Sequence, residues 1–79
     1  MSIYTDQVNE LVAIAAAIGA NCEPCLKYHY DAARKLGVSN EDMLSAVRMA
    51  LRVKQAPANA MIDLAGRLLG SPLEITKGS

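Results

Sequence analysis

Apolar residues recur every three or four positions along most of this chain, which is the spacing of one face of an α-helix. No segment alternates apolar and polar residues as a half-buried strand does, and no Asn-Gly or Asp-Gly hairpin turn is present. The pattern therefore predicts an all-α fold. The expected helices cover residues 5–18, 22–36, 40–54 and 57–69.

Residues that favour helix ends lie at these expected boundaries. Asn21 suits the N-cap of the second helix, and Gly37 suits its C-terminal stop. Ser39, followed three residues later by Asp42, resembles a capping box at the start of the third helix. Pro57 is expected near the start of a fourth helix, because proline is tolerated in a first turn and breaks a helix elsewhere.

The length and composition predict one small helical domain that assembles with copies of itself. A chain of 79 residues is expected to form a single domain over residues 1–79, with a frayed tail at residues 71–79. A chain this short buries only about 60% of its unfolded surface, yet 52% of its residues are apolar. We therefore expect a compact unit of about four helices that is an obligate homo-oligomer.

The charged residues are balanced in sign. Eight acidic residues match eight basic ones, so no charge-driven attraction to nucleic acid or to an anionic membrane is expected. The uncharged stretch at residues 11–22 is shorter than the ~20 apolar residues that span a bilayer, and the N-terminus lacks the pattern of a secretory signal. These observations predict a soluble, cytoplasmic protein, in which a close cysteine pair is more often catalytic or metal-binding than structural.

The residues with the most distinctive chemistry are concentrated in one short segment. Cys22 and Cys25 are the only cysteines, and His29 is the only histidine. In a helix, Cys25 and His29 lie one turn apart on the same face. Cys22 precedes His29 by close to two turns and therefore shares that face. The spacing predicts a dithiol with a base beside it.

A redox dithiol needs a thiolate, because the thiolate and not the thiol attacks a disulfide or a peroxide. Cys22 is expected at the first helical position, where unpaired N–H groups favour negative charge, although the neighbouring Glu23 opposes the effect. His29 can take the proton of Cys25 and then stand beside the thiolate as a cation. The two sulfur atoms can close a disulfide across the first helical turn.

Glu10 is a weaker candidate for the same site. It is the last charged residue before the apolar run, on a helix that is expected to pack against the second one. Its carboxylate could meet His29 and orient the ring, as a third group orients the base in nucleophilic catalysis. A solvated glutamate would give the same sequence pattern, so the spacing alone leaves both interpretations open.

These four residues carry a family resemblance. Glu10, Cys22, Cys25 and His29, with their spacing, resemble the active-site pattern of the AhpD-like alkylhydroperoxidase group, which belongs to the carboxymuconolactone decarboxylase superfamily. The similarity covers roughly residues 10–51, and the chain is close to one minimal repeat of the core of the larger members. The decarboxylase branch generally lacks the cysteine pair, so its reaction is not implied.

The resemblance implies an all-helical peroxidase or disulfide reductase that assembles as trimers or hexamers. It implies a peroxide or a disulfide as substrate, and a peroxiredoxin or another thiol protein as partner. Glu10 and His29 would form a proton relay, and Cys22 and Cys25 would form the redox disulfide, with no further cofactor and no metal. The spacing favours Cys25 as the cysteine activated by His29, with Cys22 as its disulfide partner.

Two other classes of function fit parts of the same pattern. Two thiolates, one imidazole and Glu10 could bind zinc, although structural zinc sites usually draw their ligands from two separated pairs. A non-catalytic helical oligomerisation module could retain the fold without the chemistry. A c-type haem is excluded, because Leu26 and not histidine follows Cys25.

Overall fold

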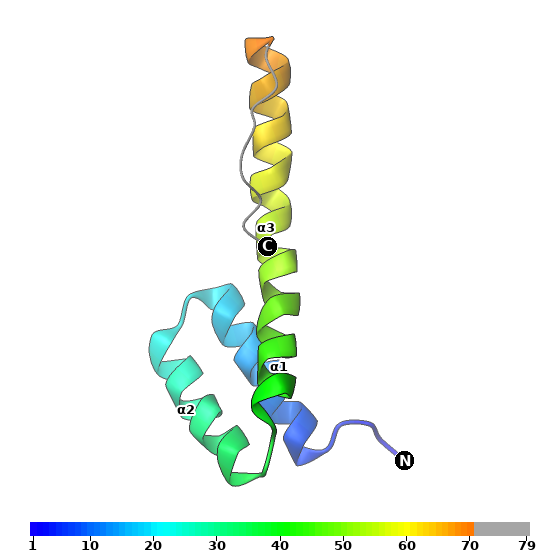
Figure 1. Ribbon diagram of the computed structural model, residues 1–79, viewed down its shortest axis with the longest axis vertical. Helices are drawn as coiled ribbons and strands as arrows, with labels where there is room; N and C mark the ends of the chain where they lie inside the picture. Colours follow the sequence, from blue (N-terminus) through cyan, green and yellow to red (C-terminus); the bar gives the residue numbers. More distant parts are fainter. Residues whose placement is uncertain (71–79) are drawn as a thin grey trace.

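The computed structural model describes residues 1–70 and consists of three helices joined by short turns (Figure 1). Helix α1 covers Asp6–Ala20, α2 covers Glu23–Lys35, and α3 covers Asn40–Leu69. No strand occurs in this part of the chain, so the all-α prediction is confirmed. The predicted fray at residues 71–79 lies outside the described residues. None of the three helices is long and apolar enough to cross a membrane.

Helix α1 is the central element of the fold. It packs against both α2 and the first half of α3, while α2 and α3 make no comparable contact with each other. The core is small and is formed by Ile14, Ala33, Val38 and Met43. Ile14 is only 1% exposed, and burying a side chain of this size stabilises the fold by about 1.5–3 kcal/mol. Ala33 is fully buried, and its small size lets the helices approach closely.

Two of the predicted helix ends are confirmed and one is shifted. The Ser39 hydroxyl accepts the backbone N–H of Asp42 at 3.1 Å and starts α3, and Gly37 has a positive φ of 78° after the end of α2. Asn21, however, is not the N-cap of α2. It has a left-handed conformation that ends α1, so the N-cap of α2 is Cys22. Asparagine tolerates this conformation, which a turn of only two residues requires.

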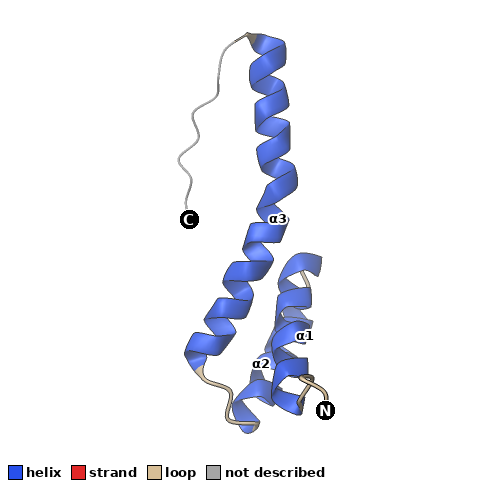
Figure 2. Ribbon diagram, turned by 90° about the vertical axis from the view of Figure 1, so that its right-hand side faces the viewer, coloured by secondary structure: helices blue, strands red, loops and turns tan. Residues whose placement is uncertain are grey.

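The prediction of separate third and fourth helices was wrong, because α3 continues through Pro57. An internal proline removes one backbone hydrogen bond and crowds the carbonyl group four residues earlier, here that of Val53. Val53 is exposed, so water can hydrogen-bond to the carbonyl oxygen that Pro57 leaves unpaired. The helix axis changes direction near its middle instead of breaking (Figure 2).

The chain is elongated and not the compact unit that the composition predicted. Its radius of gyration is 16.5 Å, whereas a compact domain of this length would have a value of about 12 Å. The second half of α3 extends beyond the other two helices, and every residue from Leu51 to Met61 is exposed (Figure 2). We call residues 55–69 of α3 the arm.

Replacing Pro57 with alanine should leave α3 intact and stabilise it. Alanine restores the missing N–H donor within a continuous helix, so we expect the free energy of unfolding to rise by about 1–3 kcal/mol. The measurement is chemical denaturation followed by circular dichroism. Pro24→Ala is the matched control, because Pro24 lies in the first turn of α2, where proline costs little. Equal effects of the two substitutions would contradict a continuous α3.

Candidate redox site

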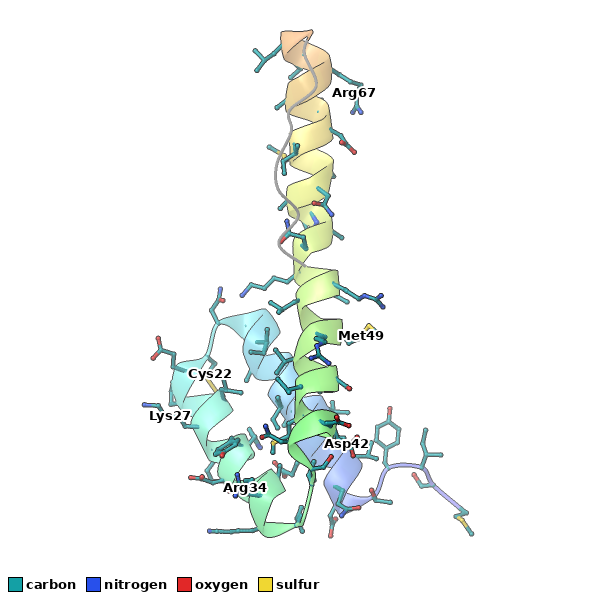
Figure 3. All side chains as sticks on the ribbon, viewed as in Figure 1. Cys22, Lys27, Arg34, Asp42, Met49 and Arg67 are labelled. Atoms are coloured by element: carbon teal, nitrogen blue, oxygen red, sulfur yellow. A yellow bond between two sulfur atoms is a disulfide. The ribbon has the colours of Figure 1, made fainter. Side chains whose placement is uncertain are left out.

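The two cysteines lie at the N-terminal end of α2 and form a disulfide (Figure 3). Their Cα atoms are 5.3 Å apart, a separation that suits a disulfide. Cys22 is the N-cap residue and Cys25 lies in the first helical turn. The spacing predicted that both cysteines share one helical face, and the structure brings their sulfur atoms together.

The sulfur atom of Cys22 also caps the helix. The backbone N–H of Cys25 donates to Cys22 Sγ, with an N···S distance of 3.3 Å. The free N–H groups of a helix N-terminus carry a partial positive charge that favours a negative group. The same position would therefore stabilise a thiolate on Cys22 once the disulfide is reduced, an effect that the nearby carboxylate of Glu23 opposes.

A tight turn determines where Cys22 lies. The backbone N–H of Cys22 donates to the Ala17 carbonyl at 3.0 Å, and that of Asn21 donates to the Ile18 carbonyl at 3.3 Å. These bonds satisfy carbonyl groups at the end of α1 that have no partner within the helix. The chain reverses direction within two residues, so the first turn of α2 lies directly beside the last turn of α1.

Glu10 and His29 meet across the interface between α1 and α2. Glu10 Oε1 lies 2.6 Å from His29 Nδ1, and the two side chains are 21% and 30% exposed. Glu10 therefore meets His29, as one of the two interpretations that the sequence left open requires. Because an ionised carboxylate only accepts hydrogen bonds, Nδ1 must carry the proton that joins the two groups. The other ring nitrogen, Nε2, is then left to accept or donate a second proton.

His29 lies one turn after Cys25 on the same face of α2. Within residues 1–70, the side-chain hydrogen bond of the His29 ring is the one to Glu10, and neither sulfur atom is its partner. In the disulfide neither sulfur carries a proton, so Cys25 can donate a hydrogen bond to His29 only after reduction. The Tyr28 ring packs edge-on against His29, with ring centres 5.0 Å apart.

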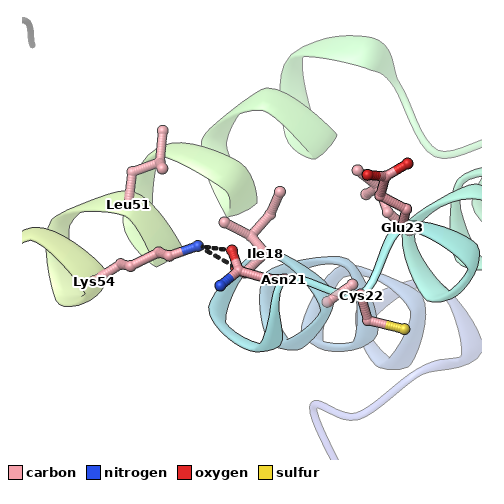
Figure 4. A pocket seen from close by; sticks show the side chains of 8 residues that line it. Ile18, Asn21, Cys22, Glu23, Leu51 and Lys54 are labelled. Carbon is pink, nitrogen blue, oxygen red and sulfur yellow. Dashed lines mark hydrogen bonds between the residues drawn. The ribbon is translucent and has the colours of Figure 1, made fainter.

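A groove of about 310 Å³ lies beside Cys22, between the end of α1, the start of α2 and the middle of α3 (Figure 4). Its lining is mainly apolar and comprises Ala17, Ile18, Asn21, Cys22, Glu23, Leu26, Leu51 and Lys54. The Cys22 sulfur points away from the Lys54 side of the groove (Figure 4). The groove therefore borders the disulfide without enclosing it.

Lys54 holds the turn that precedes Cys22, a role that the sequence alone did not predict. Its ammonium group donates to the Ile18 carbonyl at 3.0 Å and also to the side-chain oxygen of Asn21. A cation at this place complements the partial negative charge at the end of α1. Two features of the sequence could have indicated this role. The last turn of α1 has no basic residue of its own, and Lys54 occupies a position of α3 at which the helical spacing otherwise places apolar residues.

The described part of the chain contains no group of three or more His, Cys, Asp or Glu side chains placed to hold a metal ion. Glu10 and His29 pair with each other, and the two sulfur atoms are bonded together. Disulfide sulfur is not the thiolate ligand that zinc requires. The zinc interpretation of this cluster therefore gains no support from the arrangement.

Comparison with protein families adds a second line of argument. The sequence profile of the carboxymuconolactone decarboxylase family matches residues 5–65. The chain belongs to this family. Its members include decarboxylases and AhpD peroxidases. Comparisons with curated proteins and with solved structures found no significant match. The family match reaches further along α3 than the residues on which the sequence resemblance was based, and it does not specify a subgroup.

The capping role of Cys22 predicts different effects of two substitutions. In the presence of reductant, Cys22→Ser should leave stability close to that of the reduced wild-type protein, because serine is a favoured N-cap residue. Cys22→Ala should lower the free energy of unfolding by about 1 kcal/mol, because the N–H of Cys25 loses its partner. Denaturation with excess reductant measures both values. Equal stability of the serine and alanine variants would contradict the capping role.

Proposed function

We propose that this protein is an AhpD-like thiol–disulfide oxidoreductase that reduces a peroxide or the disulfide of a partner protein. The observation that supports this proposal most directly is that a cysteine pair and a histidine–glutamate pair lie close together near the N-terminal end of α2. A disulfide joins Cys22 and Cys25, and His29 lies one turn further along the same helix, paired with the carboxylate of Glu10 on α1. The family to which the chain belongs includes peroxidases, which is consistent with this proposal. No metal or organic cofactor is needed for this chemistry.

In the proposed reaction, His29 removes the proton of Cys25 through Nε2, while Glu10 holds Nδ1 and stabilises the resulting imidazolium. With a hydroperoxide, the Cys25 thiolate attacks the terminal oxygen, and an alcohol leaves with the proton from His29. The Cys25 sulfenic acid then reacts with the thiol of Cys22, which forms the disulfide and releases water.

With a disulfide substrate, the Cys25 thiolate attacks one substrate sulfur and the other leaves as a thiol. Cys22 then attacks the mixed disulfide, which releases the second thiol and closes the Cys22–Cys25 bond. Both routes oxidise the protein dithiol by two electrons and reduce the substrate by two. A peroxiredoxin or another thiol protein is the proposed partner, and a homo-oligomer, a trimer or hexamer, is the proposed assembly.

Two alternatives make different demands on the cysteines. A zinc site needs both cysteines as thiolates at once, whereas a redox site must be able to form the disulfide. A non-catalytic assembly module needs neither state. The observed bond between the sulfur atoms and the ordered base beside them favour the redox function over both alternatives.

Stoichiometric peroxide should remove both thiols of the reduced protein together. We expect a thiol titration to fall from two per chain to none, and the intact mass to fall by only two hydrogens, because the product is a disulfide. Cys22→Ser and Cys25→Ser should each abolish catalytic turnover with peroxide or with a small disulfide. Retention of wild-type turnover by either variant would falsify the dithiol mechanism, and one zinc per chain in the purified protein would favour the zinc alternative.

Substitutions in the relay should change the pH dependence and not only the rate. His29→Ala should slow oxidation of the dithiol by about 10²–10⁴-fold and move the pH optimum upward, because the thiolate must then form without a base. Glu10→Gln should have a smaller effect of the same kind. Asp6→Asn, an exposed acidic residue of α1, is the matched control for Glu10. An unchanged pH–rate profile in His29→Ala would exclude this residue as the base.

A further inference from the structure

Lys54 joins the middle of α3 to the turn that carries the first cysteine. Its ammonium group donates to the Ile18 carbonyl at 3.0 Å and to the side-chain oxygen of Asn21. Ile18 lies in the last turn of α1, and Asn21 directly precedes Cys22 in the chain. Lys54 follows these two residues by 36 and 33 positions, so both contacts exist only because α3 packs against α1.

Asn21 is the residue of this turn whose backbone most needs support. Its φ of 55° and ψ of 40° lie in the left-handed region, which residues other than glycine rarely adopt. Its backbone N–H donates to the Ile18 carbonyl, which is the same carbonyl that accepts Lys54. Lys54 therefore binds both the side chain of Asn21 and the acceptor of its N–H. Without these bonds, other conformations of the turn become accessible.

The turn in turn determines where the Cys22 sulfur points. The backbone N–H of Cys22 donates to the Ala17 carbonyl of α1, and its carbonyl accepts the N–H of Leu26 in α2. The backbone angles of Cys22, which aim its sulfur at Cys25, therefore depend on how the end of α1 lies on the start of α2. Lys54 anchors that end of α1.

We propose that Lys54 is a positioning residue of the redox site. By holding the turn, it keeps the two sulfur atoms at bonding distance and so favours the Cys22–Cys25 disulfide over the reduced dithiol. The inference rests on the proposed function, because the balance between the two states matters to a pair that turns over. The effect should appear in exchange with oxidised glutathione. In that reaction the protein dithiol gives two electrons and two protons, the protein disulfide forms, and one glutathione disulfide becomes two glutathione thiols.

The charge of Lys54 could act in the opposite direction. A cation near Cys22 would stabilise its thiolate and thereby the reduced protein. However, the Cys22 sulfur points away from Lys54 (Figure 4), and the Lys54 side chain is exposed, so water and salt screen its charge. The effect on position should therefore exceed the effect on the thiolate, and loss of Lys54 should make the disulfide easier to reduce.

The test measures the equilibrium of the full-length protein with mixtures of reduced and oxidised glutathione. Lys54→Met removes the ammonium group and keeps an apolar stem of similar length. We expect the equilibrium constant for disulfide formation to fall by about three- to tenfold, as the loss of a net hydrogen bond allows. Lys54→Arg should recover most of the wild-type value, because a guanidinium group also donates to two oxygen atoms.

Arg52→Met is the matched control. Arg52 is an exposed cation of the same helix, two positions before Lys54 and therefore on nearly the opposite side of α3. It should leave the equilibrium constant unchanged. Asn21→Gly tests the contact from the other side, because glycine keeps the left-handed turn but lacks the oxygen that Lys54 binds. It should lower the constant, and adding Lys54→Met to it should have a smaller effect than in the wild-type chain.

Denaturation with and without reductant checks that each variant is folded and gives an independent value. Lys54→Met should destabilise the oxidised protein more than the reduced one, by the same factor as the change in the glutathione constant, since the two effects are thermodynamically linked. An unchanged or increased constant in Lys54→Met would overturn the proposal. So would an equal fall in Arg52→Met, or a value for Lys54→Arg no higher than that for Lys54→Met.

None of these measurements requires catalytic turnover. A wild-type protein that equilibrates with glutathione but reduces neither a peroxide nor a small disulfide would refute the proposed function. The glutathione constants of the variants would still decide whether Lys54 positions the cysteine pair.

Discussion

The two-residue turn between α1 and α2 is the constraint on which the site depends. Since the chain reverses at Asn21 and Cys22, α2 must run back along α1. The reversal brings the carboxylate of Glu10 to the imidazole of His29, and it places the Cys22 sulfur at the free N–H groups of α2. A longer loop would leave α2 freer to shift relative to α1, and the two polar groups would lose the orientation that a proton relay requires.

Lys54 connects this turn to the rest of the protein. Its ammonium group donates to the Ile18 carbonyl of α1 and to the side chain of Asn21, so α3 is joined to the segment that carries the first cysteine. The same residue lies between the part of α3 that packs on α1 and the part that neither α1 nor α2 covers within the described residues. The helix that extends outward is therefore tied to the turn that holds the cysteine pair.

Local sequence signals predicted much of the secondary structure and the residues of the candidate site. The helical periodicity, the N-cap at Ser39 and the stop at Gly37 are determined by neighbouring residues, and the structure agrees with each. Pro57 was misjudged, because the cost of an internal proline depends on whether the freed carbonyl can reach water. Asn21 was placed at the wrong end of the turn, because asparagine suits both an N-cap and a left-handed residue.

The sequence by itself determined that two cysteines and a histidine share one helical face. The number of residues between two positions of an α-helix sets the angle between their side chains around the helix axis. It also determined that the chain is helical and rich in apolar surface. Only the tertiary structure decided that Glu10 meets His29 and that Lys54 closes the end of α1, because such contacts depend on how whole helices pack. The tertiary structure likewise decided that, within residues 1–70, neither α1 nor α2 covers the second half of α3, since α1 is 15 residues long and α3 is 30.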